Sequence, residues 1–112
     1  MAYDEDLANR IRELLGAQKG IEEKRMFGGL AFLVGGHMSV AVSGTQGGLM
    51  VRVPKEDTER MLAEPGARPF EMHGKGAAGW LLVDPGALED DDELRHWVDV
   101  GVGYASGLPP KA

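Results

Sequence analysis

The first apolar stripe with helical spacing lies near the start of the chain. Its members recur at i, i+4, i+7 and i+8, and they are Leu7, Ile11, Leu14 and Leu15. Asp4 precedes the stripe with a side chain that suits a helix N-cap, and Gly16 follows it as a typical helix stop. The pattern predicts a helix over residues 4–15.

A second stripe of the same kind lies near the end of the chain. It consists of Leu94, Trp97, Val98, Gly101, Tyr104, Ala105 and Leu108, and Asp90 and Glu93 before it are spaced as a capping box. A glycine inside a helix is about 1 kcal/mol less favourable than alanine, and this segment holds Gly101 and Gly103. Because Gly101 lies on the apolar stripe, we expect another element to approach the helix closely there.

Between the two stripes the apolar period becomes that of β-strands. Strands are predicted over 22–27, 30–34, 38–43 and 49–53. Gly35-Gly36 is typical of a tight hairpin turn, because both positions tolerate a positive φ. In the third strand, one face is expected to hold Met38, Val40 and Val42, and the other Ser39, Ala41 and Ser43. The pattern predicts an antiparallel meander of three or four strands.

The remaining segments complete an α+β order. Pro54 suits the first turn of a helix over 55–63, and Pro65-Gly66 ends it. Two more short strands, 68–72 and 80–83, flank a glycine-rich loop. Helix, three or four strands, helix, two strands, helix predicts a two-layer fold with helices packed against an antiparallel sheet, and 112 residues suit a single domain over 1–112.

Composition and charge narrow the classes of function. The chain has no cysteine, so it has no disulfide, thiolate nucleophile or cysteine-ligated metal. Its net charge of −6 disfavours direct DNA binding, which depends on Lys and Arg at phosphates. The first residues are acidic rather than typical of a signal peptide, and the longest apolar run, Leu30–Val34, is too short to span a bilayer. We expect a cytoplasmic protein.

One segment matches a nucleotide-binding motif by its letters. Gly74-Lys75-Gly76-Ala77-Ala78-Gly79 fits G-x-G-x-x-G, but a predicted strand follows it where a dinucleotide site needs a helix. We interpret the segment as a hairpin loop. The alternative is a small-ligand or nucleotide site, in which the backbone around Gly74 and Gly76 holds an anion together with Lys75.

Other candidate chemistry is sparse. The histidines, His37, His73 and His96, lack metal-ligand spacing, and His96 with Asp92 is interpreted as a solvated pair on one helix face. The serines, Ser39, Ser43 and Ser106, lie in no nucleophile motif. We expect no catalytic residue, metal or cofactor. Met38, Met50, Met72 and Trp97 are expected to fill core gaps, the alternative being an exposed subset that forms a binding surface.

Several segments together resemble one family. Arg25-Met26-Phe27-Gly28-Gly29 before the strand Leu30–Val34 resembles the opening motif of the TfoX/Sxy N-terminal domain. Further matches follow in order, at Leu49-Met50-Val51-Arg52-Val53, Pro69-Phe70, Gly74-Lys75-Gly76, Trp80, Asp84-Pro85, Glu93-Leu94, Trp97 and Ala105. They cover nearly all of the chain.

The resemblance implies a bacterial protein with the order helix, three strands, helix, two strands, helix, as in secretion-chaperone-like domains. It also implies a regulatory role, because named members are positive regulators of natural competence that assist transcription of DNA-uptake genes beside a cyclic-AMP receptor protein. Those regulators carry a second, helical C-terminal domain, which is not found in this chain ending at 109–112. We therefore expect a stand-alone N-terminal domain, and the family supplies no catalytic residues to carry over.

The leading hypothesis is a non-enzymatic regulatory module that binds a protein partner, in transcription control. The first candidates for the contact are Arg25, Phe27, Gly28, Gly29 and Arg52, and the structural alternative places Phe27 in the core and the two glycines in a bulge. Direct DNA binding through Lys24, Arg25 and Arg52 is the disfavoured alternative. An exposed edge strand leaves both a monomer and a homodimer open.

Overall fold

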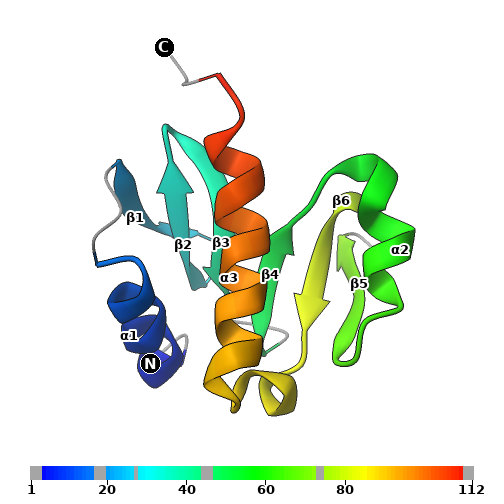
Figure 1. The fold of residues 1–112 in the computed structure, drawn as a ribbon, viewed down its shortest axis with the longest axis horizontal. Helices are drawn as coiled ribbons and strands as arrows, with labels where there is room; N and C mark the ends of the chain where they lie inside the picture. Colours follow the sequence, from blue (N-terminus) through cyan, green and yellow to red (C-terminus); the bar gives the residue numbers. More distant parts are fainter. Residues whose placement is uncertain (1–3, 17–19, 27, 44–46, 73–74, 110–112) are drawn as a thin grey trace.

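The structure is a computed structural model that describes residues 4–16, 20–26, 28–43, 47–72 and 75–109, with side chains except at 71, 72 and 75–78. Over these residues the chain forms three α-helices and one six-stranded antiparallel sheet (Figure 1). The helices are α1 (Glu5–Leu14), α2 (Thr58–Leu62) and α3 (Asp91–Ser106), with short 3-10 helices η1 (Lys55–Asp57) and η2 (Pro85–Leu88). The strands are β1 (Ile21–Met26), β2 (Gly29–Val34), β3 (His37–Val42), β4 (Leu49–Arg52), β5 (Ala67–Met72) and β6 (Lys75–Val83). The predicted α+β fold class is confirmed.

The sheet has the strand order β1-β2-β3-β4-β6-β5. The first four strands form a meander, one strand more than the resemblance implied and within the three or four that the apolar pattern predicted. The chain then passes through α2 to the far edge, where β5 begins, and β6 returns to pair with β4. In the turn between β2 and β3, Gly35 and Gly36 have φ values of 58° and 85°, which the predicted hairpin turn requires.

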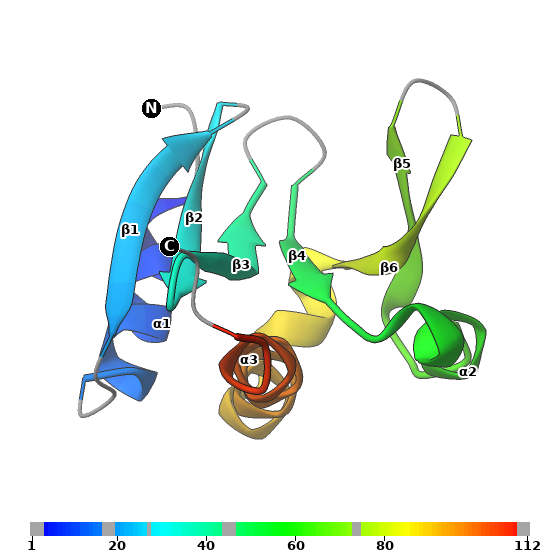
Figure 2. The same ribbon diagram turned by 90° about the horizontal axis from the view of Figure 1, so that it is seen from above.

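The main core lies between the sheet and the helices, and we call it the helix-side core. Its largest fully buried side chains include Trp97 of α3, Phe32 of β2 and Ile11 of α1, and Met61 and Leu62 of α2 pack against its margin. Figure 2 shows α3 lying across one side of the sheet. The N-termini of α1 and α3 are capped by aspartates. The carboxylates of Asp4 and Asp90 accept hydrogen bonds from the backbone N–H groups of Leu7 and Asp92.

The approach expected at Gly101 is confirmed. A Cβ atom on this glycine would lie against the Ser39 carbonyl and 2.6 Å from Cγ1 of Val40. Gly103, two residues further along α3, is exposed and has no atom within 4 Å of such a Cβ. The absence of a side chain at Gly101 therefore lets α3 lie directly on β3.

The third strand differs from its prediction because it contains a β-bulge. Leu33 pairs with Met38 and Phe32 pairs with Val40, so Ser39 has no partner position. The bulge turns Met38 to the opposite face from Val40, and the prediction that they share a face is wrong. Ser39 and Ser43 are both buried, and the Ser39 hydroxyl donates to the Phe32 carbonyl at 2.8 Å.

Two other segments also differ from their predictions. The helix expected over 55–63 is divided into η1 and the short α2. The glycine-rich segment is largely strand rather than loop, because residues 75–83 form β6, with Met72 paired to Lys75 and Glu71 to Gly76. Glycine has a weak strand propensity, so the composition of this segment predicts a loop. Pairing with the neighbouring strand β5 makes it a strand instead.

Candidate partner-binding surface

The side of the sheet that faces away from the helices carries a second apolar cluster. We call it the open-side cluster, and it consists of buried Ala31, Ala41, Met50, Phe70 and Leu82 with partly buried Met26, Leu33, Met38 and Trp80. Every one of these residues belongs to a strand, and within the described part of the chain no helix contributes to the cluster. Figure 2 shows the side of β3 and β4 opposite α3 without a helix over it.

The open-side cluster is buried at its centre and partly exposed at its margin. Ala31 and Ala41 are nearly inaccessible, whereas Leu33, Met38 and Trp80 pack against them and remain half-exposed. Methionine is flexible and polarizable, and such side chains adapt to the shape of a binding partner. The arrangement therefore offers an apolar contact surface with adaptable edges.

The methionines and the tryptophan singled out in the sequence separate between the two sides. Met38 and Met50 belong to the open-side cluster, where Met50 is buried, as core filling predicts, and Met38 is partly exposed. Trp97 lies in the helix-side core with no exposed surface, and among the described side chains its Nε1 is a buried polar atom without a hydrogen-bond partner. The side chain of Met72 is not among those that the structure describes.

Arg52 ends β4 beside this cluster and contacts two aromatic rings. Its Cζ lies 5.9 Å from the ring centroid of Trp80 on β6 and 5.6 Å from that of Tyr104 on α3, within the range of cation–π attraction. The β3–β4 ladder ends at the pair Val40–Val51, and Arg52 reaches across the resulting split to the Met38 carbonyl, at 3.4 Å from Nη1. The guanidinium is thus held in place by rings rather than by a carboxylate.

Arg52 differs from most other arginines of the protein in lacking an ion pair. Carboxylates pair with Arg10, Arg12, Arg60 and Arg68. Within the described ranges, no acidic side chain lies within ion-pair distance of Arg52, although the chain carries 18 acidic residues. Most of its N–H donors therefore remain available to a ligand.

The acidic charge of the chain is unevenly placed. Of the 18 acidic residues, the three on strands are Glu22, Glu23 and Glu71; the others lie in helices or in the turns beside them. The strands carry five of the 12 lysines and arginines, namely Lys24, Arg25, Arg52, Arg68 and Lys75. The sheet is therefore the basic part of an acidic molecule.

The structure does not bring the predicted contact residues together. Arg25 is exposed on β1 and lies in the row of Leu49, whereas Arg52 lies three residues further along β4. At ordinary strand spacing the two are separated by roughly 14 Å across the sheet and 10 Å along it. Gly28, with a φ of 76°, lies in the turn between β1 and β2, and Gly29 is the first residue of β2. Phe27 lies outside the described residues.

The anion-binding alternative has little structural description. Gly74 lies outside the described residues, and Lys75 and Gly76 belong to the β5–β6 ladder.

The two histidines that the structure describes form hydrogen bonds within the fold. His96 bonds Glu64 at 2.8 Å rather than Asp92, and His37 donates to the Pro109 carbonyl at 2.6 Å. No group of acidic and histidine side chains in the described residues has the geometry of a metal site.

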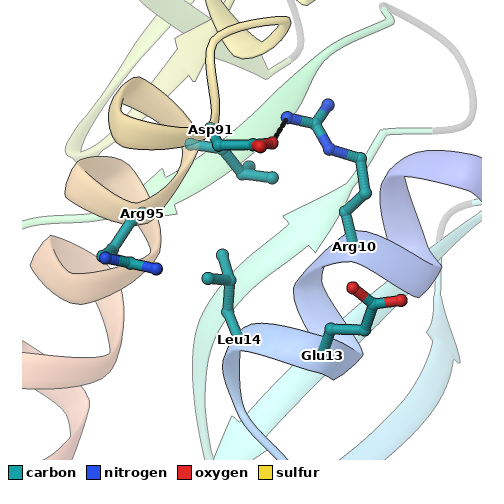
Figure 3. Close-up of a pocket in the computed structure, with 6 residues that line it drawn as sticks. Arg10, Glu13, Leu14, Asp91 and Arg95 are labelled. Atoms are coloured by element: carbon teal, nitrogen blue, oxygen red, sulfur yellow. Dashed lines mark hydrogen bonds and ion pairs between the residues drawn. The ribbon is translucent and has the colours of Figure 1, made fainter.

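A cleft of about 290 Å³ lies between α1 and the first turns of α3 (Figure 3). Its lining residues are Arg10, Glu13, Leu14, Asp91, Leu94 and Arg95. Arg10 Nη2 donates to Asp91 Oδ1 at 2.8 Å, and Arg10 also lines a second hollow of about 210 Å³ beside η2. Arg10 and Asp91 pair with each other, and the described lining holds no nucleophile beside a base.

The fold and this surface together define a small α+β domain whose helices cover one side of its sheet and leave an apolar face on the other. The chain belongs to the TfoX N-terminal domain family, whose family model matches residues 13–105. This family is not a known enzyme family. No curated protein and no solved structure matches the chain. No helix in the described segments is long and apolar enough to cross a membrane.

The family match separates the two candidate sites. The open-side cluster and Arg52 lie wholly within residues 13–105, whereas most of α1, one wall of the cleft in Figure 3, precedes them. Sequence reasoning found Arg52, Met38 and Met50 but missed Leu33, Trp80 and Tyr104. The Arg52–Trp80 pairing joins residues far apart in the chain, and no local pattern signals it.

Proposed function

We propose that this chain is a non-enzymatic regulatory module in transcription control, and that it binds a protein partner across the open-side cluster. The carrying observation is the apolar cluster on the helix-free side of the sheet, with Leu33, Met38 and Trp80 half-exposed. Exposed apolar surface of this kind is costly in water and marks interaction sites on soluble domains. The family membership and the regulators that it resembles support a regulatory rather than a catalytic role.

The composition of the surface suits protein recognition. Interface centres are enriched in aromatic residues, methionine and arginine, and the energetically dominant residues are most often Trp, Tyr and Arg. Trp80 belongs to the open-side cluster with the methionines, and Arg52 links it to Tyr104 of α3 by ring contacts on both residues. A partner covering this side would bury the half-exposed side chains without requiring the fold to change.

The test captures partners from native cells with the tagged protein and with two variants. Leu33→Lys adds a charge at a half-exposed site on the open side, where its methylene stem still covers apolar surface. Ser106→Lys adds the same charge at an exposed position near the end of α3 and serves as the matched control. We expect a near-stoichiometric protein of the transcription machinery to bind the wild type and Ser106→Lys and to be lost from Leu33→Lys. The captured protein is then purified and titrated against all three.

Two results would contradict the proposal. One is a partner that binds Leu33→Lys as tightly as the wild type in the titration. The other is a homodimer by light scattering that dissociates in Leu33→Lys, because the open side would then be occupied by a second copy of this chain. Thermal unfolding of each variant verifies that the fold is retained.

A further inference from the structure

We infer that Arg52 recognises a carboxylate, so that the partner presents an acidic segment in which an apolar side chain lies beside an Asp, a Glu or a C-terminus. The inference rests on the proposed function, because it assigns the chemistry of what lies against the open-side cluster. Its starting point is a half-buried guanidinium with two ring contacts and, among the described residues, no ion pair.

The geometry prepares Arg52 for an anion. The cation–π contacts with Trp80 and Tyr104 and the bond to the Met38 carbonyl restrict the guanidinium before any ligand binds. A planar fork held in this way bonds a carboxylate through two parallel N–H groups and loses little side-chain entropy on binding. The half-buried setting also strengthens the interaction compared with one in open water.

The surrounding charge favours the same sign of ligand. The stem of Lys55 lies close to Gly79, the neighbour of Trp80 on β6. Lys24 lies on the open side of β1, because it pairs with Ala31 of the open-side cluster. Glu22 lies on the same side of β1, because it pairs with Leu33, whereas most other acidic residues lie on the helices, and charges further away than about 10 Å are largely screened at physiological salt.

A carboxylate is favoured over a nucleic-acid phosphate by the number of cations. Binding to a nucleic-acid backbone neutralises several phosphates at once, and the chain has an overall charge of −6. Arg25, an exposed arginine of β1, points to the helix side, the same side as Glu23, and is distant from Arg52. The apolar neighbours Leu33 and Met38 suit the side chain of a peptide better than a ribose-phosphate chain.

The experiment selects short random peptides displayed on phage against the immobilised wild-type protein. We expect the enriched peptides to carry an apolar residue beside Asp or Glu. A synthetic peptide from this set is then compared with its Glu→Gln or Asp→Asn counterpart by fluorescence polarisation. Loss of the carboxylate should weaken binding roughly tenfold or more, because a hydrogen bond to a charged group contributes about 1.5–3 kcal/mol.

Variants assign this loss to Arg52. In Arg52→Gln the acidic peptide and its amide counterpart should bind equally, whereas Arg95→Gln on the exposed face of α3 removes the same charge and should retain the full difference. Arg52→Lys keeps the charge but not the stacked fork, and it should retain only part of the preference. The peptide comparison on the wild type decides the inference even if a change at Arg52 unfolds the domain.

The contradicting outcomes separate this inference from the proposed function. Apolar peptides that show no acidic preference and are lost from Leu33→Lys would overturn the carboxylate assignment and leave the binding face standing. Failure of every peptide to bind would overturn both. A labelled single-stranded oligonucleotide is the competing probe, and its Arg52-dependent binding would overturn the assignment to a peptide carboxylate.

Discussion

On the helix side of the sheet, apolar residues from strands and from all three described helices meet in one cluster, with Trp97 and Phe32 almost wholly buried. On the open side, strands alone supply the cluster, and Leu33, Met38 and Trp80 at its margin remain partly exposed. Both sides belong to the same six strands, because successive side chains along a strand point alternately to one side of the sheet and to the other. The difference shows that one sheet can supply stability from one side and leave the other for recognition.

The comparison is sharpest at two consecutive residues of β2. Phe32 faces the helices and is 1% exposed, whereas Leu33 faces the open side and is half-exposed. We expect Phe32→Ala to lower the free energy of unfolding by about 3–5 kcal/mol, because it leaves a cavity under α3. Leu33→Ala should lower it by about 1 kcal/mol, because water already reaches the side chain. Urea denaturation of the two variants measures both values.

Equal losses in this pair would break the comparison. The open-side cluster would then be a second closed core, and its half-exposed margin would carry no binding role. The variant Met50→Leu conserves volume at a buried open-side position and verifies that small changes there are tolerated.

A second pair tests the contact between α3 and the sheet. Gly101→Ala places a methyl group against the Ser39 carbonyl and Val40, and we expect a loss of about 1–3 kcal/mol from overpacking. Gly103→Ala meets open space and should stabilise the protein by about 0.5–1 kcal/mol through helix propensity. Thermal unfolding should therefore shift the midpoint in opposite directions. A stabilising Gly101→Ala would show that α3 does not lie as closely on β3 as described.

Local patterns predicted the elements whose signals are local. The Leu94–Ala105 stripe gave α3, Gly35-Gly36 gave the β2–β3 turn, and Gly101 on the apolar stripe gave the close helix contact. Each of these depends on residues a few positions apart, where helix spacing or a positive φ has a direct physical meaning.

The errors fall where distant segments decide the structure. The bulge at Ser39 depends on the register between β2 and β3, and a shift of one residue moved Met38 to the open side. The glycine-rich segment became β6 because β4 and β5 offer it hydrogen-bonding partners. The same limit hid the candidate site, because Arg52, Trp80 and Tyr104 meet only through strand pairing and helix packing.

The smallest expected effect concerns the polar attachment of α1 on the helix side. Arg12 of α1 donates from Nε and Nη2 to the two carboxylate oxygens of Glu23 on β1, each at 2.7 Å. These hydrogen bonds, aided by the charge of Arg12, hold the pKa of Glu23 below its ordinary value of 4.5, despite the opposing effect of desolvation. A lowered carboxylate pKa means that the pair stabilises the fold above pH 4.5 and that this stabilisation is lost as the pH falls through the lowered value.

The measurement is a double-mutant cycle of Arg12→Ala and Glu23→Gln, at neutral pH and again at the acid end of the folded range. Both side chains are more than a third exposed, so solvent screening limits the coupling to about 0.5 kcal/mol at neutral pH. The coupling should fall toward zero in acid, and Glu22→Gln on the opposite side of β1 controls for the lost charge. A coupling that persists unchanged at a pH where Glu23 is protonated would show that packing rather than the ion pair joins α1 to the edge strand. The contrast between the two sides would then rest on apolar contacts alone.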